Sequence, residues 1–254
     1  AFLSAYSGKD PNKYKLGLFS QVPLPNWRIS YNGLSKIKWL QPVFTSISLT
    51  HGYNSTMTIN SFQTNLNAEI DANGNTVKKD SLSGNFFANY AIPSVIVNEQ
   101  FSPLIGVDIT FKNNILVRFD YKKSRTLTMS FSDYQMIENK STTITAGLGY
   151  TIRGLKMPFK IKGKKPRLDN DLKFKCDVSY RDGVIINHRV DQFTPQITSG
   201  STNITVSPSI DYVINNRINV RLFVDYNKTI PRISTGYPTT NVKGGLQLRL
   251  SLAQ

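Results

Sequence analysis

The sequence predicts an all-β fold of antiparallel strands, the architecture of a transmembrane β-barrel. Apolar and polar side chains alternate along many segments, whereas the period of an amphipathic helix is almost absent. The best segments are about 11 to 13 residues long, near the roughly 9–11 residues with which a tilted strand crosses a bilayer, and longer than the five or six usual in soluble sandwiches. Tyrosine, whose apolar ring and polar hydroxyl suit a membrane interface, stands at or near the segment ends: Tyr31, Tyr53, Tyr121, Tyr150, Tyr180 and Tyr226.

Residues 1–26 are expected to be a lead-in region, and residues 27–254 a single β-barrel segment of about a dozen antiparallel strands. In the first part of the chain, strands are predicted where β-branched and aromatic residues alternate with polar ones. Lys112-Asn113-Asn114 is predicted to be a short turn, because asparagine enters the left-handed region at little cost. The predicted strands are 27–34, 43–53, 58–67, 83–91, 104–111, 115–122, 125–132 and 142–152.

The alternation is clearest in the last third of the chain. Segment 171–181 has apolar residues at every second position and charged or hydroxyl side chains between them. Asp182-Gly183 follows, a dipeptide suited to a tight hairpin turn because both residues tolerate positive φ. Further strands are predicted around 204–214, then at 217–227 after an Asn215-Asn216 turn, and at 240–252.

The predicted connections alternate in length. Short ones are expected at 112–114, 182–183 and 215–216, and longer ones near 92–103, 154–170, 190–200 and 229–239. Outer-membrane barrels have short turns on the periplasmic side and longer loops on the outer side. This pattern favours a membrane barrel over an ordinary soluble all-β protein, which is the alternative that composition leaves open.

Composition sets two further bounds. No stretch approaches the roughly 20 apolar residues of a membrane-spanning helix, and mean hydropathy is −0.27. These averages are compatible with a barrel, because a barrel strand hides its apolar face by alternation. The formal net charge of +15 indicates a polyanionic partner such as nucleic acid, anionic lipid or an acidic polymer.

The ends and the cysteine content also limit the interpretation. The N-terminal segment lacks the basic start and apolar core of a signal peptide. We therefore expect that a signal was removed or that the chain begins inside a longer polypeptide. Cys176 is the single cysteine, so an intrachain disulfide is excluded, and we expect it to be a small lipid-facing side chain rather than a reactive thiol.

The sequence argues against an enzyme. The two histidines, His51 and His188, belong to no metal-binding spacing, and no Gly-rich phosphate loop or Gly-x-Ser-x-Gly turn is present. Asp169 and Asp171 precede a strand without a partner acid or base. No catalytic, cofactor-binding or metal-binding residue is therefore predicted.

Three runs of sequence resemble a known family. They are PLPNWRISYNGLSKI at 23–37, YKKSRTLTMSFSDYQ at 121–135, and NNRINVRLFVDYNKTIPRISTGYPTTNVKGGLQLRL at 215–250. Together they are similar to runs near the C-terminus of the SprA/Sov-type giant outer-membrane translocon of the Bacteroidota type IX secretion system. The runs occur in the family's order, and the resemblance covers only the last part of that much longer family.

This resemblance implies that the chain is the C-terminal sector of a very large barrel in the bacterial outer membrane. It implies a channel for export of folded proteins, which serves type IX secretion and gliding motility, and it implies no cofactor. The implied partners are the remainder of the same barrel, secreted cargo proteins, outer-membrane lipid and lipopolysaccharide, a gating β-barrel shuttle protein and a periplasmic plug. Nucleic acid is not among them.

If the apolar face meets lipid, the basic residues between the apolar positions line the channel interior. A hydrated interior keeps such charges solvated, whereas lipid exposure costs about 2–4 kcal/mol each near the midplane. Plain solvation of the inner face, without any cargo specificity, is the simpler interpretation. The candidate pore-lining residues are Lys173, Lys175, Arg181, Arg217, Arg221, Lys243 and Arg249.

The predicted loop at 154–169 is strongly basic. Clustered cations attract polyanions, so contact with lipopolysaccharide phosphate or an acidic partner is one interpretation, and a solvated loop is the other. The residues concerned are Lys156, Lys160, Lys162, Lys164, Lys165 and Arg167. The alternative function for the whole chain is a soluble or surface-exposed β-domain that binds an acidic polymer.

Overall fold

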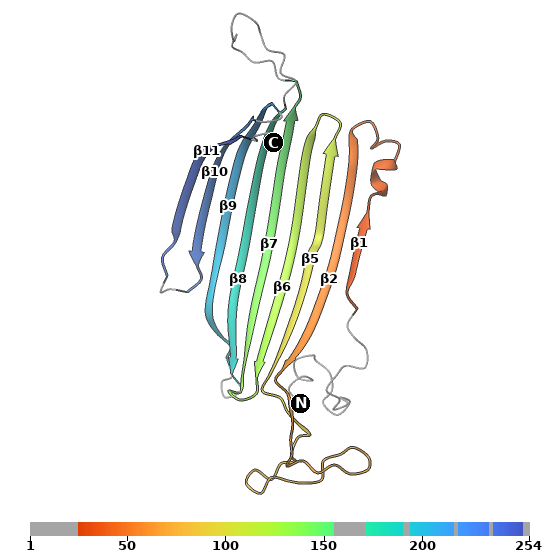
Figure 1. Cartoon of the computed structure of the whole chain (residues 1–254), viewed down its shortest axis with the longest axis vertical. Coiled ribbons are helices and arrows are strands. Elements are labelled where there is room, and N and C mark those ends of the chain that lie inside the picture. Colours follow the sequence, from red (N-terminus) through yellow and green to blue (C-terminus); the bar gives the residue numbers. More distant parts are fainter. Residues whose placement is uncertain (1–24, 155–170, 190–193, 216–217, 234–235, 251–254) are drawn as a thin grey trace, which may run out of the picture.

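The computed structural model describes residues 25–154, 171–189, 194–215, 218–233 and 236–250. Nine strands form one antiparallel sheet in the order β1-β2-β5-β6-β7-β8-β9-β10-β11, and the sheet is not closed into a barrel (Figure 1). The prediction of an antiparallel all-β fold is thus confirmed. The strands are β1 (Trp27–Tyr31), β2 (Phe44–Asn60), β5 (Ser94–Phe111), β6 (Ile115–Ser130), β7 (Gln135–Ile152), β8 (Leu172–Arg189), β9 (Gln196–Asn215), β10 (Ile218–Pro231) and β11 (Thr239–Leu250).

The sheet is a meander with one long interruption between β2 and β5. Residues 61–93 leave the sheet there and project beyond its lower end in Figure 1. This extension holds a two-stranded sheet of β3 (Gln63–Thr64) and β4 (Tyr90–Ala91). A short 3-10 helix, η2 (Gly33–Lys36), lies between β1 and β2 at the upper end. No helix among the described residues is long and apolar enough to cross a membrane.

Most strands are longer than the sequence pattern predicted, although β1 and β11 are slightly shorter than the predicted strands 27–34 and 240–252. Six of the nine strands are 16–20 residues long, so neighbouring predicted strands merge into one element. Predicted strands 115–122 and 125–132 form the single strand β6. Between them, Lys123 and Arg125 are paired with residues of both neighbouring strands instead of forming a turn. The predicted loop near 92–103 is wrong, since it forms the first half of β5. Predicted strands 58–67 and 83–91 lie largely in the extension.

The predicted hairpin turn at Asp182-Gly183 is also wrong. Both residues lie inside β8, where Asp182 pairs with Thr142 on one side and Thr202 on the other. The Asp182 carboxylate accepts a hydrogen bond from Thr202 Oγ1 at 3.0 Å and is paired with Arg232. Pairing on both edges of the strand therefore overrides the local turn preference of Asp-Gly.

The predicted alternation of short and long connections is not observed. The turn at 112–114 lies at the upper end of the sheet in Figure 1, where β9 also ends and β10 begins. Ile152 and Leu172, the strand ends on either side of the predicted long loop, lie at that same end. At the lower end, the four-residue turn 131–134 was missed, because no Gly or Asn-Gly marks it.

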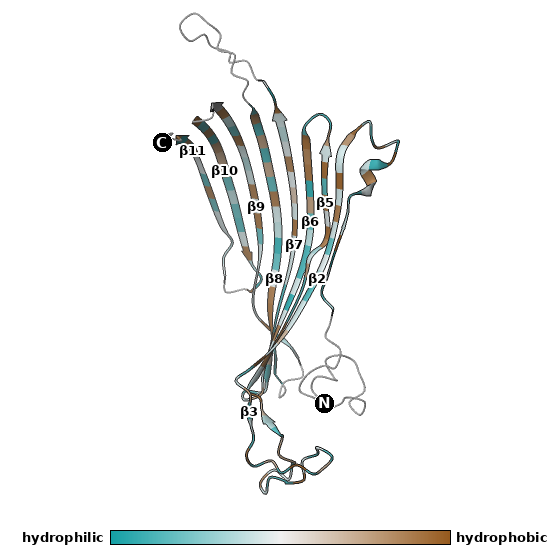
Figure 2. Ribbon diagram, turned by 45° about the vertical axis from the view of Figure 1, so that its right-hand side comes forward, coloured by the Kyte–Doolittle hydropathy of each residue, from teal (hydrophilic) through white to brown (hydrophobic). Residues whose placement is uncertain are grey.

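Because the sheet is a single layer, the strand registers sort the side chains into two faces. We call them the band face, which carries Leu172, Phe174 and Cys176 of β8, and the charged face, which carries Lys173 and Lys175. The alternation of hydrophobic and hydrophilic residues along each strand is visible in Figure 2. A small buried cluster lies on the band face near the lower end, formed by Val95, Leu127, Met129 and Met136.

Candidate functional site

The upper part of the band face is a continuous apolar surface. Consecutive cross-strand rows contain only apolar or tyrosine side chains, for example Tyr150, Phe174, Ile210, Leu222 and Leu246. On β7 to β11 these rows occupy 144–152, 172–180, 204–212, 218–226 and 242–250, and on β6 and β5 they continue through 115–121 and 105–111. No charged side chain of the described β5–β11 residues lies on this face within these ranges. We call this surface the apolar band.

Aromatic residues border the apolar band. At its lower edge, Tyr121 and Tyr180 stand in one cross-strand row on either side of Ile144. At its upper edge, Tyr150 pairs directly with Phe174. The sequence placed these tyrosines at strand ends, but Tyr121, Tyr180 and Tyr226 lie inside their strands. They mark the edge of the apolar band, since each strand continues for several residues below it.

The charged face collects the predicted pore-lining residues. Lys173, Lys175 and Arg181 of β8, Arg221 of β10, and Lys243 and Arg249 of β11 all lie on it, opposite the apolar band. Arg217 lies outside the described residues. Whether this face lines a channel stays a prediction.

Sequence reasoning missed the acidic partners of these cations. Asp211 of β9 stands between Lys173 and Arg221, with Arg221 Nε at 3.7 Å from its carboxylate. Arg118 Nε donates to Asp108 at 2.7 Å on the same face. Asp225 pairs with Lys243 across β10 and β11. The charged face thus carries side chains of both signs and is not uniformly positive. The alternation of apolar and polar residues along each strand is the signal that could have placed these aspartates on that face.

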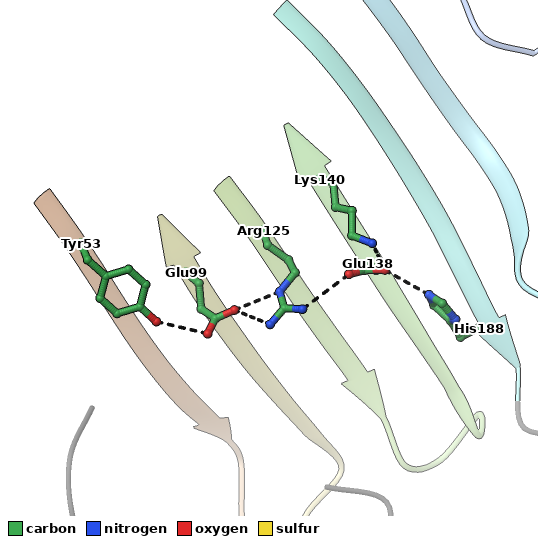
Figure 3. A network of polar contacts seen from close by, with 6 residues as sticks. All are labelled: Tyr53, Glu99, Arg125, Glu138, Lys140 and His188. Carbon is green, nitrogen blue, oxygen red and sulfur yellow. Dashed lines mark hydrogen bonds and ion pairs between the residues drawn. The ribbon is translucent and has the colours of Figure 1, made fainter. Parts of the chain in front are cut away.

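A second polar feature lies on the band face just below the apolar band (Figure 3). Tyr53 Oη donates to Glu99 at 3.2 Å, and Arg125 Nε donates to the same carboxylate at 2.9 Å. Arg125 also reaches Glu138 at 3.9 Å, while Lys140 Nζ and His188 Nε2 lie 2.9 and 3.2 Å from Glu138. The six residues come from five adjacent strands. We call them the ion-pair network.

Glu138 is the centre of the ion-pair network. Its side chain is only 4% exposed, and Arg125, Lys140 and His188 surround its carboxylate. A buried carboxylate is costly unless it is paired and hydrogen-bonded, and these partners supply that pairing. This arrangement is not predictable from the sequence pattern, because Glu99 falls in the predicted loop 92–103 and local alternation does not determine strand register.

The predicted basic loop cannot be placed against this site. Lys156, Lys160, Lys162, Lys164, Lys165 and Arg167 lie outside the described residues, so their contact with lipopolysaccharide or a partner stays a prediction. Within the described ranges, no three metal-ligating side chains lie together. The fold and the site together define an antiparallel all-β protein whose sheet, among the described residues, has one apolar face without a covering layer. No protein-family model and no curated protein matches the chain.

Proposed function

We propose that this chain forms part of the wall of a transmembrane β-barrel in the bacterial outer membrane, and that the barrel is a protein-conducting channel of the type IX secretion type. The observation that carries the proposal is the apolar band, an uncharged surface on a sheet face over which the described residues place no second layer. The three sequence runs that resemble the SprA/Sov-type translocon support the choice of channel.

The size of the apolar band argues for lipid contact. Soluble proteins rarely leave more than a few hundred Å² of contiguous apolar surface uncovered. Here large side chains on several adjacent strands are exposed together, among them Leu148, Val178, Leu222, Leu246 and Leu248. Lipid tails cover such a surface without a specific partner, and the arrangement of the two faces, apolar on one and charged on the other, is the one expected of a membrane barrel.

The length of the apolar band also fits a bilayer. Nine residues of strand, as in 172–180 of β8, span roughly 30 Å at about 3.3 Å per residue. Tilted by about 40°, they cover about 23 Å of depth, close to the roughly 25 Å apolar band of outer-membrane barrels. The lower halves of the strands, with the ion-pair network, then stand outside the hydrocarbon region.

The open edges argue that other strands complete the barrel. β1 covers only the middle of β2, at 49–53, and the outer edge of β11 has no partner among the described residues. An unpaired backbone group in hydrocarbon costs several kcal/mol, so both edges need pairing within the membrane. The remainder of a larger barrel, as the family resemblance implies, supplies that pairing.

The charged face then lines the channel, and the chain acts as a wall rather than a motor. Its mixed charges keep the interior hydrated and offer passing proteins no uniform electrostatic trap. In this proposal the cargo consists of folded secreted proteins, and the partners are those that the resemblance implies: the remaining barrel, a gating shuttle protein and a periplasmic plug.

Membrane extraction together with an export assay tests this function. We expect the protein to stay in the outer-membrane pellet after urea and alkaline washes, and to need detergent for release. We also expect depletion of the protein to stop the export of cargo. A protein released by the washes would instead be the alternative, a surface β-domain that binds an acidic polymer. If the protein is embedded in the membrane but its depletion leaves export intact, the barrel is supported and the role in protein export is wrong.

A further inference from the structure

An open cavity of about 790 Å³ lies on the band face immediately below the apolar band. One wall is aromatic: Trp27 stacks on Tyr53 with ring centroids 4.6 Å apart, and Tyr53 contacts Phe101 at 4.9 Å. The opposite wall carries the cations Lys123, Arg125 and Lys140, and the two carboxylates that also line the cavity, Glu99 and Asp182, are each paired with an arginine. The sheet order explains this division, because the aromatic residues come from β1, β2 and β5 and the cations from β6 and β7.

The cations differ in how fully they are neutralised. Arg125 is bound to Glu99, and Lys140 to Glu138, within the ion-pair network. Lys123 has no ion-pair partner among the described residues. It pairs with Phe101 across the β5–β6 ladder and lies two residues below Tyr121, in the first row outside the apolar band. Its charge is therefore available to an external anion at the place where the apolar surface ends.

We propose that this cavity binds the phosphate-bearing headgroup of an anionic phospholipid. The inference rests on the proposed function, since it requires the apolar band to face lipid. Lys123, assisted by Lys140, takes the phosphate, because an ammonium group binds phosphate oxygens as a compact point charge. Trp27, Tyr53 and Phe101 cover the glycerol region, as aromatic side chains do at a membrane interface.

The position of the cavity favours a lipid over a soluble phosphate compound. The cavity is continuous with the apolar band, since Phe101 and Lys123 lie in the row next to Tyr121 and Ile144. A ligand with a phosphate head and hydrocarbon tails matches both surfaces at once, whereas a soluble phosphate compound uses only one.

The chain carries its own reporter for this site. It has two tryptophans, Trp27 in the cavity wall and Trp39, which is 75% exposed in the turn at the other end of the sheet. In a Trp39→Phe background, Trp27 alone fluoresces, and bromine atoms on a lipid quench it on contact. The protein is placed in phosphatidylcholine bilayers with a small fraction of brominated phosphatidylglycerol or, in parallel, of brominated phosphatidylcholine.

Lys122 and Lys123 provide a matched pair of variants. They are consecutive residues of β6 with the same charge, but Lys122 is on the charged face and only Lys123 lines the cavity. We expect brominated phosphatidylglycerol to quench Trp27 several-fold more than the same fraction of brominated phosphatidylcholine. Lys123→Gln should lower this preference about five-fold, as expected for one basic residue near an anionic surface, and Lys122→Gln should leave it unchanged.

The outcomes separate this inference from the proposed function. Equal quenching by both lipids, or equal effects of Lys122→Gln and Lys123→Gln, overturns the headgroup site while the membrane barrel stands. If millimolar inorganic phosphate abolishes the preference for brominated phosphatidylglycerol, the site binds free phosphate and the lipid is not its occupant. Absence of quenching by either lipid places Trp27 away from lipid and overturns the headgroup site, while membrane extraction decides separately whether the barrel stands. Quenching of Lys123→Gln by brominated phosphatidylcholine confirms that this variant is folded and inserted.

Discussion

Leu222 of β10 and Leu246 of β11 lie directly opposite each other on the band face, and they are 48% and 70% exposed. In a water-soluble sheet such a leucine pair is normally covered by a second layer. Here the same exposure continues across Phe174 and Tyr150 in the same row, so the whole row needs an apolar environment. In the proposed barrel, lipid hydrocarbon supplies that environment.

Adjacent residues on opposite faces should respond differently to the same substitution. Val178→Arg places a charge in the apolar band, at a cost of about 2–4 kcal/mol if that band faces hydrocarbon. Ser179→Arg puts the same side chain on the charged face, where it stays hydrated, and Lys175→Gln should also be mild. Yield of protein in urea-washed outer membranes is the measurement. Equal losses for Val178→Arg and Ser179→Arg would show that the faces are assigned incorrectly.

Deletion of β11 should prevent assembly. The 12 residues Thr239–Leu250 pair along β10, so their removal exposes the backbone edge of β10 within the apolar band. Several unsatisfied backbone groups in hydrocarbon cost more than a barrel's stability supplies. We expect loss of membrane-inserted protein and of export together, as judged by heat-modifiable mobility on gels and a cargo assay. A truncated protein that still inserts and exports would refute the role of this edge.

Removal of the extension should be tolerated. Asn60 and Ser94 pair with each other where β2 ends and β5 begins, so a two-residue Asn-Gly turn can replace residues 61–93. This change removes no strand pairing of the nine-stranded sheet. We expect wild-type amounts of inserted protein, and a large loss would mean that the extension contributes to barrel assembly.

Glu138→Gln should weaken the folded state more than an ordinary surface change. It removes the carboxylate charge that pairs with Lys140 and contacts His188 and Arg125 beside a buried cluster, while Arg125 keeps its pair with Glu99. We expect a loss of about 3 kcal/mol in unfolding free energy, measured by denaturant titration in detergent. The control is Glu69→Gln, which breaks an exposed ion pair with Lys78 and should cost under about 1 kcal/mol. Similar losses for both variants would count against a structural role for the ion-pair network.

Acid should loosen the extension before the sheet. Hydrogen bonds from the backbone of Asn75 lower the pKa of Asp71, and the Ser83 hydroxyl lowers the pKa of Asp80. A carboxyl with a lowered pKa in the folded state stabilises its turn at pH values above its unfolded pKa, and this contribution disappears as pH falls through the folded pKa. Limited proteolysis over an acidic pH series should therefore cut the extension first, and Asp71→Asn should remove part of the pH dependence. Cleavage that is independent of pH would contradict this.

The sequence pattern predicted the two faces better than it predicted the strand ends. Alternation is local, so it placed Lys173, Lys175, Arg181, Arg221, Lys243 and Arg249 on one face, as the registers do. Strand ends depend on which neighbours are paired. Asp182-Gly183 reads as a turn in isolation, but it remains in the strand because both edges of β8 are paired there.

The ion-pair network and the cavity beside it could not be predicted from the sequence for a related reason. Glu99, Arg125 and Glu138 lie on three successive strands, and they meet only because particular registers align them. A shift by one residue would send each side chain to the other face. Local patterns contain no information about register, so no motif in the sequence could have revealed these contacts.

Cysteine accessibility in intact outer membranes tests most directly the claim that the band face meets lipid. Cys176, the single cysteine, lies within the apolar band, and Lys175 beside it lies on the charged face. A charged, water-soluble maleimide should leave wild-type Cys176 unlabelled and should label Lys175→Cys in a Cys176→Ser background, while both label fully after denaturation. Equal labelling of the two positions, or faster labelling of Cys176, would contradict the assignment of this face to the membrane.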